Sequence, residues 1–392
     1  MRNTRVAYLT YDGLTDPLGQ SQVLPYLVGL SIKGYEFTVI SFEKPAAFSK
    51  RNAEIKSICV QNNITWIPKK YHKKPPVLST LYDVWVMWHA VKKCYLQNSF
   101  PIIHCRSYIT SLVGLRAKRK WGVKFIFDMR GFWVDERVEG GLWNLKNPMF
   151  KLIFNFFKNK EIEFLREADH IMSLTYNAKS EIESWKIDNA PITVIPTCVD
   201  LEMFDPKKVS LDDKKDLRNR LGIGNNHFVL LYLGSWGTWY LTDKMLSFFS
   251  ELKNKQPHAK FMIITGDKVN LADFRWKQDV IVMHSERKKV PTFITIADAA
   301  ICFVKTTFSK KASSATKIAE IIAMGVPVFT NHGWGDMNLL ADNSSKSPFH
   351  SFPPEMQRDF VFLDSSYFSK GLDFSLKSAV VSYDNIYKGL LK

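Results

Sequence analysis

The sequence predicts an α/β protein with two doubly wound, Rossmann-like sheets that face each other across a cleft. Short apolar strands alternate with helices, and the alternation begins again after a charged and polar stretch at 206–226. A glycine-containing loop follows the first strand of each half, a usual ligand position in such sheets. We therefore expect an N-terminal domain over 1–205, a C-terminal domain over 206–366, and a final helix over 367–392 that packs back on the N-terminal domain.

The N-terminal half opens with a β-α-β unit. A strand at 6–10 is followed by a loop at 11–19, a helix at 20–33 that ends at Gly34, and a strand at 37–41. Parallel strands joined in this way require a right-handed crossover. The other elements expected in this half are strands at 102–104, 125–127, 171–174 and 193–195 and a helix at 150–167.

The C-terminal half repeats this architecture without repeating the sequence. A strand at 228–233 leads into a small-residue loop at 234–238, and a helix follows at 242–253. Such a loop lets the backbone approach a ligand closely, although a tight strand-to-helix turn needs glycine as well. The later strands are expected at 260–265, 280–284, 299–304 and 326–330.

Basic residues are concentrated in one part of this chain, whose net charge is +16. Between residues 44 and 124, 16 Lys and Arg stand against two acids, Glu54 and Asp83, with Trp85 and Trp88 among them. Such a surface suits anionic lipid, nucleic acid or an acidic glycan, and it is also typical of a solvated basic face. Because no nucleic-acid-binding motif is present, we expect an anionic membrane surface as the partner of 44–124 and no nucleic acid.

The cysteines and the apolar segments indicate a cytoplasmic protein. Five scattered cysteines lack the spacing of a metal site, so we expect reduced thiols. No apolar run reaches the roughly 18 residues of a membrane span, and the N-terminus lacks a signal-peptide layout. We expect a cytoplasmic location, peripheral on the inner face of the cell membrane.

A short helix preceding Gly325 is the most informative segment of the chain. Ser313 and Ser314 are good N-caps, and Gly325 followed by Pro327 is typical of a helix end.

Lys317 and Glu320 lie one turn apart on this helix. Free N–H groups at a helix N-terminus and a nearby lysine favour an anion such as a diphosphate, and a carboxylate can accept hydrogen bonds from a ribose diol. An ordinary surface Lys–Glu pair would have the same spacing.

A second informative segment, 127–143, follows a predicted strand and combines acids, arginines, aromatics and glycines. Aromatic rings can stack on sugars, carboxylates can bind hydroxyls, and Arg130 can stabilise developing phosphate charge. An Asp–Arg network that only orders the loop is the alternative. His104 and Arg106, after the preceding strand, are expected to line the same cleft.

Four segments in order resemble the retaining glycosyltransferases of family 4, which have the GT-B architecture. They are 8–21, 195–204, 311–327 and 331–336. They resemble, respectively, the family's acceptor-side loop, its interdomain hinge, its donor-binding helix and the loop after that helix. The resemblance covers nearly the whole chain.

The resemblance implies a nucleoside-diphosphate sugar, UDP- or GDP-linked, as the donor substrate, with no cofactor. Glu320 would take the ribose hydroxyls, and Lys317 would take the phosphates. The other donor-binding residues implied are Gly234, Ser235, Gly237, Ser313, Ser314 and Thr316. The acceptor-binding residues implied are Gly19, Gln20, Arg106, Asp135 and Glu136. The catalytic residues implied are Asp128, Arg130 and Lys317.

The chain departs from the family pattern at three places. Ala312 stands where the first of two glutamates is usual, Ser235 and Trp236 stand near an expected arginine, and Arg130 stands where a histidine is common. These departures leave open two alternatives. One is a catalytically degenerate GT-B protein that binds a glycan or a partner, and the other is a GT-B nucleotide-sugar epimerase.

Retention at the anomeric carbon is the mechanism that the resemblance implies. The nucleoside diphosphate leaves on the face that the acceptor hydroxyl attacks, and the leaving phosphate takes the proton, so no enzymic nucleophile is needed. No Asp-x-Asp motif stands in a suitable loop, so we expect no metal. The expected acceptor is a lipid-linked or polysaccharide intermediate of bacterial surface glycans, such as lipopolysaccharide.

Overall fold

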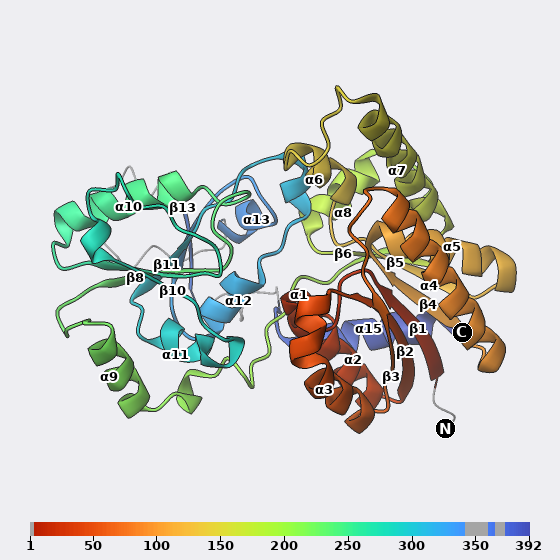
Figure 1. Ribbon diagram of the computed structural model, residues 1–392, viewed down its shortest axis with the longest axis horizontal. Helices are drawn as coiled ribbons and strands as arrows, with labels where there is room; N and C mark the ends of the chain where they lie inside the picture. Colours follow the sequence, from red (N-terminus) through yellow and green to blue (C-terminus); the bar gives the residue numbers. More distant parts are fainter. Residues whose placement is uncertain (1–3, 342–359, 365–372) are drawn as a thin grey trace. The chain divides into compact units, whose positions relative to one another are not determined.

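The computed structural model describes residues 4–341, 360–364 and 373–392, which form two compact units (Figure 1). Unit 1 comprises 1–196 and 376–392, and unit 2 comprises 197–375. The boundary lies before Thr197 and not at the expected 205. The reason is that Val199 and Phe204 are buried in the core of unit 2, where Val199 pairs with Ser375.

Unit 1 contains a sheet of seven parallel strands in the order β3-β2-β1-β4-β5-β6-β7. Apolar runs with few polar interruptions form its central strands, because helices cover both faces of a parallel sheet. The strands are β1 (Thr4–Thr10), β2 (Tyr35–Glu43), β3 (Thr65–Lys70), β4 (Ile102–Arg106), β5 (Lys124–Asp128), β6 (His170–Ser173) and β7 (Ile192–Val194).

Nine helices of unit 1 lie among its described residues. They are α1 (Pro17–Gln22), α2 (Leu24–Ile32), α3 (Pro45–Gln61), α4 (Leu78–Gln97), α5 (Ser107–Trp121), α6 (Trp133–Glu139), α7 (Pro148–Glu167), α8 (Tyr176–Ser184) and α15 (Leu376–Leu390). Helix α15, at the C-terminus, packs against α2 (Figure 1). It begins at Leu376, whereas the expected start at 367 lies outside the described residues.

The single helix expected at 20–33 is wrong, because the chain forms α1 and α2 with a break at Val23. Pro25 explains the break: it has no N–H to donate, and its ring would clash with the carbonyl four residues earlier. Strand β3 and helices α3 to α5 were not predicted from the sequence.

Unit 2 contains a six-stranded sheet in the order β10-β9-β8-β11-β12-β13, in which only β13 runs antiparallel to its neighbour. The predicted strands of this half are confirmed within a few residues. The strands are β8 (Val229–Leu233), β9 (Lys260–Ile264), β10 (Val280–Met283), β11 (Ala299–Cys302), β12 (Val328–Asn331) and β13 (Phe360–Leu363).

Apolar side chains from both faces of this sheet form two clusters. One cluster includes Ile318, Ile321 and Ile322, which form the apolar face of a helix. The α-helices described in unit 2 are α9 (Leu211–Arg220), α10 (Thr242–Lys255), α11 (Val290–Thr295), α12 (Thr316–Ala323) and α13 (Met337–Ala341). The 3-10 helices are η1 (Pro206–Lys208), η2 (Lys277–Asp279), η3 (Arg287–Lys289) and η4 (Phe308–Ala312).

In both sheets the strand order reverses beside the first strand of the unit, between β1 and β4 and between β8 and β11. Ligands of doubly wound sheets bind at such points, beyond the carboxyl ends of the strands. The candidate residues of each unit are therefore sought there. In the described part of the chain, no helix has the length and apolar character needed to cross a membrane.

Candidate functional site

The loop after β1 is anchored by a buried carboxylate at the end of β2. Oxygens of Glu43 accept hydrogen bonds from the N–H groups of Leu14 (2.8 Å) and Thr15 (3.1 Å) and from the hydroxyl of Ser41 (2.5 Å). Gly13 must lack a side chain here, because a Cβ would lie 2.5 Å from Oε2 of Glu43. The loop therefore has a fixed backbone.

Gly19 and Gln20, expected to bind the acceptor, help to hold this loop. A Cβ on the buried Gly19 would lie 2.1 Å from the carbonyl oxygen of Gly13, so only glycine allows α1 to pack here. The side-chain amide of Gln20 donates to the carbonyl of Thr15 at 2.8 Å. Both residues have structural roles in this unit, and their role in acceptor binding stays a prediction.

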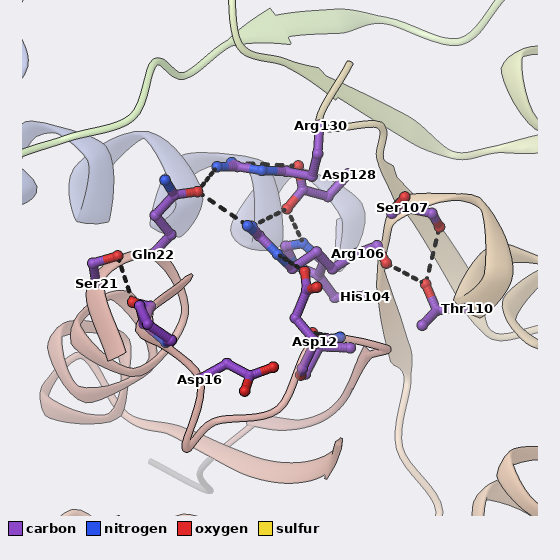
Figure 2. A network of polar contacts seen from close by, with 12 residues as sticks. Asp12, Asp16, Ser21, Gln22, His104, Arg106, Ser107, Thr110, Asp128 and Arg130 are labelled. Carbon is purple, nitrogen blue, oxygen red and sulfur yellow. Dashed lines mark hydrogen bonds and ion pairs between the residues drawn. The ribbon is translucent and has the colours of Figure 1, made fainter. Parts of the chain in front are cut away.

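The carboxyl ends of β4 and β5 bring two expected site residues together around Gln22 (Figure 2). Arg106 ends β4, and Arg130 lies two residues beyond β5. Their Nη2 atoms both donate to Oε1 of Gln22, at 3.0 Å and 2.7 Å respectively. Nε of Arg106 also lies 3.5 Å from a carboxylate oxygen of Asp12 in the loop after β1.

Asp128 lies beneath these guanidinium groups and is buried. Its oxygens are 3.7 Å from Nη1 of Arg130, 3.8 Å from Nη1 of Arg106 and 3.6 Å from Nε2 of His104. Burial acts to raise the pKa of Asp128, but Arg130, His104 and Arg106 outweigh it, and the pKa lies below its usual value. The carboxylate is therefore ionised at neutral pH.

His104 is fully buried in β4 and connects this network to α15. Its Nδ1 lies 2.7 Å from the hydroxyl of Tyr387, and its ring stacks on Tyr383. Burial lowers the pKa of His104 because it disfavours the charged form, and the nearby Asp128 opposes this only in part. The imidazole is therefore neutral at neutral pH.

The backbone is strained where the two strands end. Ser107 has a φ of 71° and Arg130 a φ of 57°, in the left-handed region that residues other than glycine rarely adopt. Such strain persists only where the surrounding structure enforces it, and it is common at functional sites.

Two other expected acceptor residues, Asp135 and Glu136, lie on α6. Asp135 forms an ion pair with Lys158 of α7 at 3.0 Å, and Lys158 also pairs with the buried Glu161. Glu161 in turn accepts a hydrogen bond from the hydroxyl of Tyr108. Asp135 thus belongs to a network that joins helices, separate from the contacts of Arg106 and Arg130.

In unit 2, Lys317 of α12 lies against the loop after β8. Its Nζ is 3.7 Å from the ring centre of Tyr240 and 3.5 Å from the hydroxyl of Tyr232. Gly234 has a φ of 115°, and a Cβ there would lie 2.5 Å from this Nζ. The hydroxyl of Tyr232 also donates to the carbonyl of Ser235. The structure therefore brings together the expected lysine and the expected glycine loop, which also includes Gly237.

Glu320, one turn further along α12, is only 4% exposed. Oε1 of Glu320 lies 2.7 Å from Nη2 of Arg287, in η3. The carboxylate expected to bind ribose is therefore already paired with a cation, and a ribose diol would have to share it or displace Arg287. Nothing in the local sequence pattern indicates this pairing, because 33 positions separate the partners.

The prediction that Ser313 or Ser314 caps the helix is wrong. Helix α12 begins at Thr316 with Ala315 at the N-cap and no side-chain cap. The N–H of Ser313 donates to the carbonyl of Lys310, and Ser314 exchanges three hydrogen bonds with Thr197. The backbone N–H of Ser313 and the hydroxyl of Ser314 are therefore occupied, and phosphate binding by these two groups would require these bonds to change.

The end of the helix is as predicted, since Gly325 follows the C-cap with a φ of 78°. Ala312, at the place of the family's first glutamate, is buried at the end of η4. Among the residues that the structure describes, no group of three or more His, Cys, Asp or Glu side chains is placed to hold a metal ion. The five cysteines, all of which lie among the described residues, form no disulfide.

Comparison with known sequences relates part of the chain to a family. Residues 23–203 match the model of Glycosyltransferase Family 4. A D-inositol 3-phosphate glycosyltransferase of Catenulispora acidiphila is 24% identical over 168 residues, which are 43% of this chain. The matched region spans only 37% of that relative's length.

Comparison with solved structures extends the likeness to the whole chain. A glycosyltransferase from Rickettsia africae superposes with a TM-score of 0.69 at 16% identity and full coverage of both chains. The Anabaena protein HepE, solved with UDP-glucose, gives a TM-score of 0.66 at 13% identity, with 99% of this chain and 100% of that chain covered. At these identities the likeness shows the fold, which is GT-B. The match to the Glycosyltransferase Family 4 model covers residues 23–203, which are less than half of the chain.

Proposed function

We propose that the protein is a retaining glycosyltransferase that uses a UDP- or GDP-linked sugar as its donor. The observation that carries the proposal is the arrangement of α12 in unit 2. Lys317 lies against the Gly234 loop at the switch point of the sheet, and the buried Glu320 lies one turn away on the same helix. A cation and a small-residue loop suit a diphosphate, and a carboxylate at one turn's distance suits a ribose diol.

The proposed roles follow from this chemistry. Lys317 and backbone N–H groups near Thr316 take the diphosphate, aided by the loop residues Gly234, Ser235 and Gly237. Glu320 takes the ribose hydroxyls. The acceptor hydroxyl attacks on the face from which the diphosphate leaves, and the diphosphate oxygen receives its proton. Asp128 and Arg130 are proposed to position the reacting groups and to stabilise developing charge.

Calorimetric titration with UDP and with GDP tests the donor site. We expect one nucleotide to bind the wild type and its affinity to fall at least about tenfold in Glu320→Ala, which removes a charged hydrogen-bond acceptor. Glu286→Ala, at an exposed position beside η3, is the control and should bind as the wild type does. Failure of both nucleotides to bind would favour the catalytically degenerate alternative.

The epimerase alternative makes a separate prediction. An epimerase would invert a ring carbon of the sugar nucleotide in the absence of any acceptor, whereas the proposed transferase would not. Incubation with the nucleotide sugar alone, followed by NMR of the sugar ring, distinguishes an epimerase from a transferase.

We also propose that no metal is required, so transferase activity should persist in excess EDTA.

We propose a lipid-linked or polysaccharide acceptor of bacterial surface glycan synthesis, met at the inner face of the cell membrane. The exposed side of α4 supports this. Four large apolar side chains at helical spacing are more than half exposed there: Leu78, Leu81, Tyr82 and Trp85. Lys73 and Lys74 lie just before them and are exposed.

The charge of this region supports an anionic surface. Asp83, one of only two acids between 44 and 124, is buried and bound to Tyr11 and His72, so it does not offset the surface lysines. Apolar side chains flanked by lysines bind a lipid interface that carries negative charge.

Co-sedimentation with vesicles tests this surface. We expect binding to vesicles that contain phosphatidylglycerol, weaker binding to pure phosphatidylcholine, and a loss in the double variant Leu81→Ser, Trp85→Ser. Ile32→Ser, which changes an apolar residue of α2 that is 78% exposed, is the control. Equal binding of the double variant and the wild type would exclude α4 as the contact.

A further inference from the structure

We infer that the Arg106–Arg130 pair of unit 1 is a binding site for a phosphate group carried by the acceptor. The inference deepens the proposed function and rests on it, since it names the chemistry of the acceptor. The pair lies at the switch point of the unit 1 sheet, where β1, β4 and β5 end (Figure 2).

Both guanidinium groups converge on one neutral acceptor. Nη2 of Arg106 and Nη2 of Arg130 donate to Oε1 of Gln22, at 3.0 Å and 2.7 Å. A single amide oxygen is a weak match for two cations, because arginine bonds most strongly to an ionised acceptor. The amide oxygen therefore marks the point where an anionic oxygen would be held best.

Further donors of the pair are buried without an acceptor. Nε of Arg130 and both Nε and Nη1 of Arg106 have no hydrogen-bond partner of good geometry among the described residues, although the hydroxyl of Tyr8 interacts with Arg106. The nearest carboxylate oxygens of Asp12 and Asp128 lie 3.5 Å and 3.8 Å from Arg106, too far for strong hydrogen bonds. A buried donor left unpaired is costly and rare, so these atoms indicate a missing ligand.

The charge around the arginine pair is unbalanced. Two guanidinium groups face one buried carboxylate, that of Asp128, and His104 is neutral. Asp12 also faces Arg106, but its side chain is 44% exposed, so water screens it and leaves it free to turn away. The buried part of the site therefore carries one uncompensated positive charge.

The donors outnumber the oxygens of a carboxylate. Five guanidinium nitrogens, three from Arg106 and two from Arg130, either point at Gln22 or lack a partner. A phosphate monoester offers three oxygens and up to two charges, and arginine's planar fork suits it. The phosphate can belong to a water-soluble sugar phosphate or to a lipid carrier, because the recognised group is the same.

Calorimetry of the full chain with inorganic phosphate tests the site. We expect the Kd to rise at least about tenfold in Arg130→Gln, which removes one charged partner. Arg119→Gln, on the outer side of α5, should bind phosphate as the wild type does. Lys317→Ala, which removes the anion-binding lysine of unit 2, separates any phosphate that binds there from phosphate bound by the arginine pair.

A second variant keeps the test valid if Arg130→Gln fails to fold. Gln22→Ala leaves both arginines in place and removes the group that phosphate would displace, so it should bind phosphate at least as tightly as the wild type. A pair with a purely structural role would lose stability in this variant without gaining affinity. Wild-type affinity in a folded Arg130→Gln, or loss of binding in Lys317→Ala alone, would overturn the inference.

Competition identifies the source of the phosphate. Displacement of inorganic phosphate by a hexose phosphate assigns a soluble acceptor, and displacement by vesicles with polyprenyl phosphate assigns a lipid-linked one. Displacement by neither would refute an acceptor role. The nucleotide titration of Glu320→Ala reports on unit 2 alone, so failure of the donor site and failure of this site remain distinguishable.

Discussion

At the scale of single residues, His104 and Asp128 show how burial and charge set protonation in unit 1. The same burial acts on both side chains, yet Asp128 is held ionised by two arginines whereas His104 is held neutral. A neutral imidazole can hydrogen-bond Tyr387 through Nδ1 without adding a third positive charge beneath Arg106 and Arg130. The result is a fixed pattern of charge across neutral pH.

His104 makes stability depend on pH in a predictable direction. Its folded pKa is lowered, so below about pH 6.5 the unfolded chain takes up a proton that the folded chain does not. The free energy of unfolding should therefore fall as pH drops from 7.5 to 5.5, by at most about 1.4 kcal/mol per pH unit for this group. Urea unfolding at three pH values measures the slope.

The control for this prediction is a second histidine. His104→Gln should flatten the slope, while His332→Gln, at an exposed position, should leave it unchanged. His170 has a lowered pKa as well, through its own burial, so part of the slope should remain in His104→Gln. Asp128 acts below this window, because its lowered pKa gives stability that is lost only as pH falls below about 4. An unchanged slope in His104→Gln would contradict the assignment.

At the scale of elements, α12 and the loop after β8 depend on each other through one glycine. Gly234→Ala places a Cβ 2.5 Å from Nζ of Lys317 and strains a backbone with a φ of 115°. We expect it to displace Lys317 and to weaken nucleotide binding as much as Lys317→Ala does. Calorimetry with the preferred nucleotide provides the measurement.

Gly222→Ala separates displacement of Lys317 from backbone strain. Gly222 also has a positive φ, 65°, but a Cβ there would meet nothing within 4 Å. It should lose about 1–2 kcal/mol of stability, as Gly234→Ala does from strain, yet keep nucleotide affinity. If both variants weakened nucleotide binding equally, backbone strain and not the displacement of Lys317 would be the cause of the weaker binding.

The elements also show what a sequence can predict. The end of α12 and the glycine loops were predictable, because turns and helix ends depend on nearby residues. The start of α12 was not, because hydrogen bonds to Lys310 and Thr197 hold the two serines elsewhere. Arg106 was expected to line the same cleft as Asp128 and Arg130, because these residues follow successive predicted strands. The contacts of Gln22 and Arg287 were not predictable, because their partners lie far away along the chain and no local pattern indicates them.

At the scale of the whole molecule, α15 belongs to unit 1 although unit 2 precedes it in the chain. Its buried Tyr387 bonds to His104, and its Asp384 accepts a hydrogen bond from the hydroxyl of Tyr35 at 2.8 Å. Gly29 of α2 faces α15, because a Cβ there would lie 2.6 Å from a methyl group of Val380. Unit 1 is therefore incomplete without this helix.

A truncation after Ser375 tests this dependence. Loss of the buried rings of Tyr383 and Tyr387 should cost unit 1 about 3 kcal/mol or more, while unit 2 keeps its core. We expect an early unfolding transition and retained nucleotide binding. A chain lacking only the exposed Leu391 and Lys392 serves as the control, and a truncated chain that unfolds like it would show that α15 is dispensable.

Because α15 completes unit 1, it affects the order in which the two units can fold during synthesis. Domains commonly fold from the N-terminus as they leave the ribosome. Here the order is inverted, because unit 2 is fully synthesised before the helix that completes unit 1 has been translated. A premature stop codon before α15 would thus damage unit 1, most of which is encoded before unit 2, and a nascent chain would expose the α15-binding face of α2 until α15 has been translated.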